Sequence, residues 1–131
     1  MVSVEMCTYS DAVEKKVLIV EDEPLIRIMA KDIVEDAGFS VLDVGNADDA
    51  LVLMNSYHNI RVIFTDVDMP GSIDGIEFAT IVKERWPHVG IIIASGHRYL
   101  RDQTDMPAGS IFLSKPYDVQ RLNDTLCAMV A

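Results

Sequence analysis

Five short apolar runs alternate with longer segments of helical period, and this alternation constrains the fold more than any other feature of the chain. The apolar runs are residues 17–20, 39–44, 61–65, 89–94 and 110–113. Strands that alternate with helices pair in parallel, because each helix carries the chain back along the sheet before the next strand begins. The sequence therefore predicts an α/β fold: one doubly wound, five-stranded parallel sheet with helices on both faces.

The segments between the apolar runs carry signals for the ends of helices. Pro24 suits a first helical turn and Gly38 a stop, which predicts a helix over residues 24–37. Asn46 can cap a helix that runs through Ser56, and Asp118 can cap a last helix that runs through Met129. A third helix is expected to open at residue 74 or 75 and to end near residues 86–87. Only residues 99–104 remain for a helix between the last two strands, so this fourth helix is expected to be short.

Composition limits both the size of the protein and its partners. At 131 residues, half of them hydrophobic, the chain predicts a polar leader over 1–15 and a single domain over 16–131. A net charge of -10 disfavours direct binding to nucleic acid or to anionic membranes. No apolar run approaches the roughly 20 residues that a membrane span needs, so a cytoplasmic protein without membrane insertion is expected. Cys7 and Cys127 have no metal-binding spacing and are interpreted as free thiols.

Three carboxylates follow two of the predicted strands. Glu21 and Asp22 come directly after the first strand, and Asp66 follows the third. In parallel sheets, ligands bind beyond the carboxyl ends of the strands, where these side chains are expected to meet. Their mutual repulsion would raise at least one pKa unless a cation lay among them. Oxygen-only ligands, with the backbone carbonyl of Asp68 as a further candidate, favour Mg²⁺, and Mn²⁺ could substitute for it.

Two further polar residues are expected at the same edge of the sheet. Ser95 follows the fourth strand and Lys115 follows the fifth. Lys115 can pair with a carboxylate at rest and with a phosphoryl oxygen after transfer, and the Ser95 hydroxyl can donate to the same oxygen. With Mg²⁺ and Lys115 offsetting the charge, Asp66 could attack a phosphorus atom and form an aspartyl phosphate. The residues therefore indicate phosphoryl transfer.

Four segments in this order resemble the signatures of two-component response-regulator receiver domains. The segments are residues 17–22, 64–70, 94–95 and 113–116, and the resemblance covers roughly residues 16–130. It implies a flavodoxin-like fold with strand order 2-1-3-4-5, similar to the single-domain chemotaxis regulators. It also implies a phosphoacceptor signalling domain and not an enzyme, with at most self-phosphorylation from small phosphodonors and autodephosphorylation.

The resemblance also assigns roles to single residues. Glu21 and Asp22 would bind Mg²⁺, and Asp66 would accept a phosphoryl group from a histidine kinase or a histidine phosphotransfer protein. Ser95 and Lys115 would detect its arrival. Phe112, an aromatic residue three places before the lysine, would act with Ser95 as the switch toward a downstream protein partner.

The chain departs from the commonest receiver pattern in three places. The loop over residues 71–75 is one residue longer, the expected fourth helix is shortened, and Glu21 replaces the more frequent aspartate. The cognate kinase, the downstream output, homodimerisation and the choice between a stand-alone regulator and an excised domain stay open.

Three alternative functions compete with the receiver interpretation. The first is a pseudo-receiver that binds partners without phosphorylation, and retention of the site residues argues against it. The second is a haloacid-dehalogenase-like aspartyl phosphatase, because Asp66-Val67-Asp68 resembles the opening motif of those enzymes; however, they place it near the start of the chain. The third, a nucleotide or flavin binder, lacks the expected glycine-rich loop here.

Overall fold

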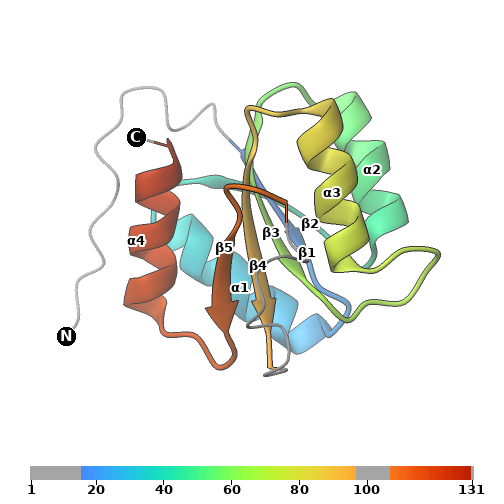
Figure 1. Ribbon diagram of the computed structural model, residues 1–131. Coiled ribbons are helices and arrows are strands. Elements are labelled where there is room, and N and C mark those ends of the chain that lie inside the picture. Colours follow the sequence, from blue (N-terminus) through green and yellow to red (C-terminus); the bar gives the residue numbers. More distant parts are fainter. Residues whose placement is uncertain (1–15, 97–106, 131) are drawn as a thin grey trace.

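Five parallel strands form one sheet at the centre of the molecule (Figure 1). The computed structural model describes residues 16–96 and 107–130. The strand order is β2-β1-β3-β4-β5, which confirms the predicted doubly wound sheet and its order. The strands are β1 (Lys16–Val20), β2 (Ser40–Val44), β3 (Ile60–Asp66), β4 (Gly90–Ser95) and β5 (Ile111–Ser114).

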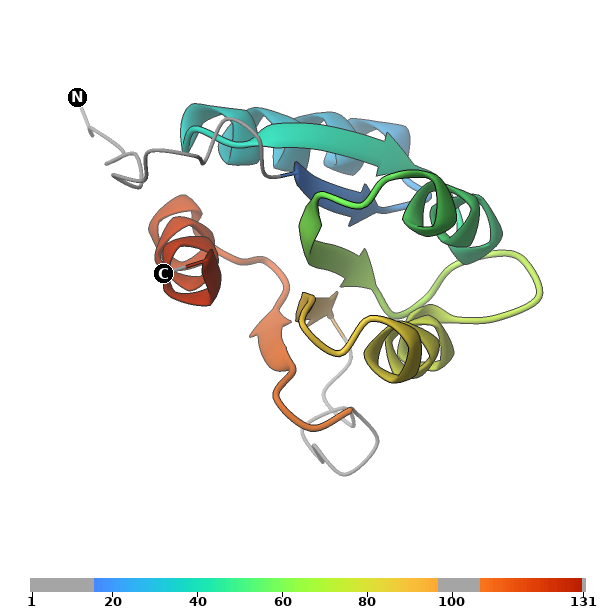
Figure 2. The same cartoon turned by 90° about the horizontal axis from the view of Figure 1, so that it is seen from above.

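Helices cover both faces of this sheet (Figure 2). They are α1 (Pro24–Asp36), α2 (Ala47–Ser56), α3 (Gly75–Arg85) and α4 (Val119–Val130). Along β1, Val17 and Ile19 pack in the cluster beneath α1 and α4, whereas Leu18 and Val20 pack in the cluster beneath α2 and α3. Successive side chains of a strand point to opposite faces, so a sheet buried on both sides needs continuous apolar strands. This explains the five apolar runs of the sequence.

The residues predicted to begin or end helices do so at both ends of α1 and at the first turns of α2, α3 and α4. Pro24 is the first residue of α1, and Gly38, with a φ of 100°, follows that helix in the left-handed region that glycine tolerates. Asn46, Asp74 and Asp118 each accept a hydrogen bond from the backbone N–H three residues later. Such caps typically contribute about 1 kcal/mol each.

Some expectations differ from the structure or lie outside the part that it describes. β3 is one residue longer at each end than the predicted 61–65, so it includes Asp66. The leader over 1–15 and the short helix expected over 99–104 lie outside the described residues. Cys127 on α4 is disulfide-bonded, so the prediction of a free thiol is wrong there. Two cysteines far apart in sequence give no spacing signal of such a bond, and Cys7 lies outside the described residues. No described helix is both long enough and apolar enough to cross a membrane.

Candidate functional site

The carboxyl ends of β1, β3, β4 and β5 lie along one edge of the sheet (Figure 1). Val20 pairs with Thr65, and Asp66 pairs with Ala94, so the residues that follow these pairs continue along the same edge. The Lys115 N–H donates to the Ser95 carbonyl at 2.9 Å, which continues the β4–β5 ladder beyond the last strand residue. Strand register therefore brings the predicted site residues to one edge.

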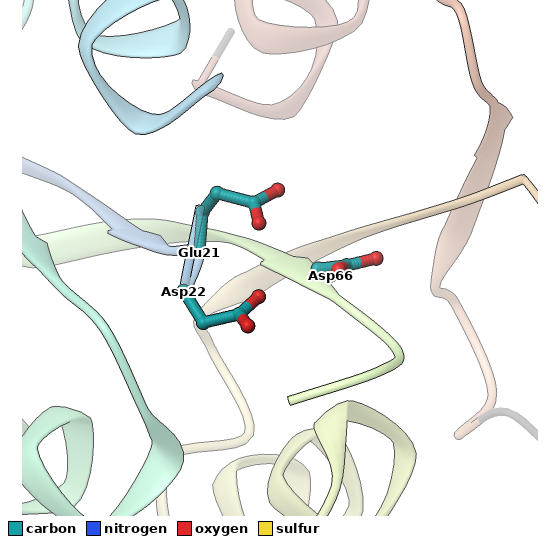
Figure 3. A group of neighbouring side chains, drawn as sticks. All are labelled: Glu21, Asp22 and Asp66. Atoms are coloured by element: carbon teal, nitrogen blue, oxygen red, sulfur yellow. The ribbon is translucent and has the colours of Figure 1, made fainter. Parts of the chain in front are cut away.

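Glu21, Asp22 and Asp66 form a compact group of carboxylates at this edge (Figure 3). Each offers one oxygen, and these oxygens lie within 4.8 Å of one another. The side chain of Glu21 is only 6% exposed and that of Asp66 11%, whereas Asp22 is exposed. An oxygen-only donor set that is open to water on one side suits Mg²⁺, which keeps several of its own waters. The residues present therefore fit that ion.

Lys115 connects two of these carboxylates. Its Nζ lies 3.1 Å from Oε1 of Glu21 and 3.3 Å from Oδ1 of Asp66, and its side chain is 23% exposed. The same Oδ1 of Asp66 accepts a hydrogen bond of 2.9 Å from the Val67 N–H. The sequence indicated that Lys115 would pair with a carboxylate, and the structure shows that it contacts two.

Burial and charge shift the pKa values of these groups. Burial raises the pKa of Asp66 and of Glu21 above their ordinary values, and the nearby Lys115 opposes the rise only in part. For Lys115, burial acts to lower the pKa, but its bonds and charge attraction to Glu21 and Asp66 outweigh burial and raise it. The lysine therefore stays charged, while the carboxylates are less stable as anions than they would be in water. A divalent cation would relieve that cost.

Ser95, Phe112 and Asp68 lie around this group. Ser95 is buried at the end of β4. Phe112 on β5 is half-buried and packs against the core cluster beneath α2 and α3. Asp68 follows β3 by two residues, on an exposed part of the chain. None of the three lines the small cavity that lies between Glu21 and Lys115.

Tyr117 was not among the predicted site residues, yet it lines that small cavity together with Glu21, Asp66 and Lys115. Its ring meets the ring of Phe64 edge-on, with 5.3 Å between the centroids. Burial raises the pKa of the Tyr117 hydroxyl. An aromatic residue two places after the lysine, within a polar turn, was the only signal of this position in the sequence.

An apolar groove of about 400 Å³ opens beside the site. Lys115 and Tyr117 line both the groove and the small cavity. The other residues around the groove come from α1 and from the chain leading into α4: Ile26, Met29, Ile33, Pro116 and Val119. The apolar surface therefore reaches the charged group itself.

Together these features define a class of protein: a flavodoxin-like α/β domain whose acidic centre, with a paired lysine, lies at the carboxyl edge of the sheet. The family model for the response regulator receiver domain matches residues 17–127. The chain belongs to this family. Receiver domains of this family are signalling phosphoacceptors and not classical enzymes; they bind Mg²⁺ at an acidic pocket and interact with histidine kinases and downstream effectors.

Known relatives agree with this assignment. The chain is 34% identical over 109 residues to the nitrogen assimilation regulatory protein NtrX of Azorhizobium caulinodans, which covers 81% of this chain and 24% of that protein. The chain thus spans about a quarter of the length of the first curated relatives that it matches.

Two solved structures share the fold over nearly their whole length. A response regulator receiver protein from Sinorhizobium medicae is 26% identical, with a TM-score of 0.83, and the match covers 93% of this chain and 97% of that one. The response regulator TrrA of Thermotoga maritima, in complex with Mg²⁺-BeF, is 25% identical, with a TM-score of 0.81 and coverage of 88% and 98%.

Proposed function

We propose that this chain is the phosphoacceptor of a two-component or phosphorelay system, in which Mg²⁺-dependent phosphorylation of Asp66 switches a surface that binds a protein partner. One observation carries the proposal: Lys115 Nζ lies 3.3 Å from Oδ1 of Asp66, in a group that also holds Glu21 and Asp22. A strand-end carboxylate with a fixed cation and two further acids is suited to receive a phosphoryl group.

The contacts of Asp66 indicate which oxygen attacks. Among the described residues, both Lys115 and the Val67 N–H contact Oδ1. Oδ2 is then the nucleophile: it forms the bond to phosphorus, while the bond from phosphorus to the donor nitrogen of a phosphohistidine breaks and that nitrogen keeps the electron pair. Glu21, Asp22, Asp66 and the Asp68 carbonyl would hold a metal ion, Mg²⁺ or Mn²⁺, and that ion would supply positive charge to offset the charge of the phosphoryl group.

Lys115 and Ser95 are proposed to respond to the new phosphoryl group. Lys115 exchanges an ion pair with a carboxylate for one with a phosphoryl oxygen, which carries more charge. The Ser95 hydroxyl donates to another of these oxygens and carries the end of β4 with it. Phe112 lies on the neighbouring strand and is only half-buried, so its ring can change position at little packing cost. This is the proposed switch.

The apolar groove beside the site suggests where a phosphodonor protein binds. The groove and the reaction centre share Lys115, and Leu25, Ile28 and Met29 on α1 are large, exposed apolar side chains nearby. A histidine kinase or histidine phosphotransfer protein bound there would hold its phosphohistidine close to Asp66. The receiver unit is proposed to span residues 16–131 after a polar leader over 1–15.

Intact-mass analysis after incubation with acetyl phosphate tests the phosphoacceptor role. The wild type is expected to gain one phosphoryl group only when Mg²⁺ is present, and Asp66→Asn none. Asp68→Asn is the matched control, because it neutralises an exposed acid two residues away and keeps its backbone carbonyl. No adduct on folded wild type would instead support a pseudo-receiver. Phosphate release over many turnovers would support a phosphatase.

A further inference from the structure

Arg27 lies in the first turns of α1 and reaches back to the end of β1. Its Nη1 donates to the backbone carbonyl of Glu21 at 2.9 Å, and its Nε lies 3.2 Å from Oδ2 of Asp43 on β2. The Arg27 side chain is 25% exposed. A single guanidinium thus joins α1, β2 and the first of the two adjacent acids.

We infer that Arg27 is a positioning residue for the metal site: it fixes the peptide that joins Glu21 to Asp22. This inference rests on the proposed function, since it concerns the same acidic group. The carbonyl that Arg27 binds belongs to the planar peptide unit that also contains the Asp22 nitrogen. Holding this oxygen therefore sets the direction in which Asp22 leaves the strand.

The rest of the Glu21 backbone and its side chain are also held. The Glu21 N–H donates to the Val44 carbonyl at 3.1 Å, which is the last bond of the β1–β2 ladder. The Glu21 carboxylate accepts a bond of 3.1 Å from the Glu23 N–H, and its other oxygen pairs with Lys115. The carbonyl bond from Arg27 completes the set, so the Glu21 carboxylate and the backbone that leads into Asp22 are oriented before any ion binds.

The surroundings of Arg27 suit this role. Asp43 anchors the guanidinium at 3.2 Å, whereas Lys31 contacts the other oxygen of Asp43 at the longer distance of 3.7 Å. A Cβ atom at Gly45 would lie 2.9 Å from Nη1 of Arg27, so the absence of a side chain there leaves space for the guanidinium. Only arginine offers several donors in a rigid plane, and therefore lysine cannot make both contacts in the same way.

Positioning and simple charge effects have opposite consequences for Mg²⁺ affinity. Removing a cation near an acidic group makes the local potential more negative, which should strengthen Mg²⁺ binding. Loss of a group that orients metal ligands weakens binding, typically by about 10–100-fold. The sign of the change in affinity for an Arg27 variant therefore separates the two explanations.

Calorimetric titration of the full chain with Mg²⁺, without any phosphodonor, tests the inference. Arg27→Ala is expected to raise the Mg²⁺ dissociation constant about tenfold. Gly45→Ala displaces the guanidinium without changing the net charge and is expected to weaken binding in the same direction. Lys31→Ala is the matched control: it removes a cation from the same helix and the same Asp43, and should stay within about twofold of wild type.

Three results would overturn the inference and leave the proposed function standing. The first is unchanged or tighter binding by Arg27→Ala. The second is a Gly45→Ala protein that binds Mg²⁺ as tightly as the wild type does. This variant keeps the test valid if Arg27→Ala does not fold. The third is an equal loss in Lys31→Ala, which would show that the loss does not depend on the bond from Arg27 to the Glu21 carbonyl. Absence of Mg²⁺ binding by the wild type would contradict the metal-dependent function itself, together with this inference.

Discussion

Replacing Gly75 by alanine is expected to lower the free energy of unfolding by about 3 kcal/mol and to displace Asp66. An alanine Cβ would lie 1.9 Å from the carbonyl oxygen of Asp66, 2.8 Å from its carbonyl carbon and 2.9 Å from Cα of Val67. All three are backbone atoms that cannot rotate away. The Gly75 N–H also donates to the Val67 carbonyl at 2.9 Å, so the two segments are bonded at this approach.

The magnitude follows from what must move to accept the added methyl group. Overpacking in a well-packed site costs roughly 1–3 kcal/mol, and a clash with backbone atoms belongs at the upper end of that range. Gly90→Ala is the matched control: its Cβ would lie 2.9 Å from Sδ of Met129, the end of a flexible side chain, and it should cost less than about 1 kcal/mol.

Urea denaturation of both variants measures the difference, and the rate of phosphorylation by acetyl phosphate reports on Asp66. We expect Gly75→Ala to be the less stable variant and to react more slowly, because the Asp66 peptide must shift to make room. A Gly75→Ala protein within about 1 kcal/mol of wild type, or no less stable than Gly90→Ala, would refute the reasoning.

Three further changes test the charged group. Mg²⁺ should raise the urea midpoint of the wild type but not of Asp22→Ala, because an ion stabilises only the state that binds it. Burial raises the pKa of Asp66 and Glu21, so the metal-free fold binds more protons than the unfolded chain does. The stability that these two carboxyl groups contribute is therefore lost as the pH rises from their ordinary pKa values, 3.8 for Asp66 and 4.5 for Glu21, through their raised pKa values in the fold. Urea denaturation at several pH values should show that Asp66→Asn loses less stability over this range than the wild type does. Lys115→Ala should still accept some phosphate, but phosphorylation should no longer change how much of a downstream partner it binds in a pull-down. A change in partner binding as large as that of the wild type would contradict the role of the lysine.

The sequence predicted the sheet because each of its signals depends on local pattern. Apolar runs of four to six residues indicate the strands, and caps such as Asn46 and Asp74 act within three residues of their own position. The meeting of Asp66 with Glu21 was predictable as well, since parallel strands end at a common edge. An error of one residue in the predicted end of a strand, as at β3, does not move that edge.

Other features depend on contacts between distant side chains and had no local signal. Arg27 contacts both a carbonyl of β1 and a carboxylate of β2, and nothing in the residues around it distinguishes it from an ordinary exposed arginine of a helix. The close approach of Gly75 to Asp66 depends on how the loop between β3 and α3 folds back against the end of β3. The position of Tyr117 beside the reaction centre depends on its packing against Phe64. Each of these needs three-dimensional coordinates.

Chemical mapping of the phosphorylated residue tests the central claim most directly. Sodium borohydride reduces an aspartyl phosphate to homoserine, so protein that has been treated with acetyl phosphate and Mg²⁺, reduced and digested can be examined by peptide mass spectrometry. We expect homoserine at position 66 and at no other aspartate. Homoserine at Asp22 or Asp68 instead, or a phosphoryl group that survives on a serine or histidine, would contradict the assignment of Asp66 as the phosphoacceptor.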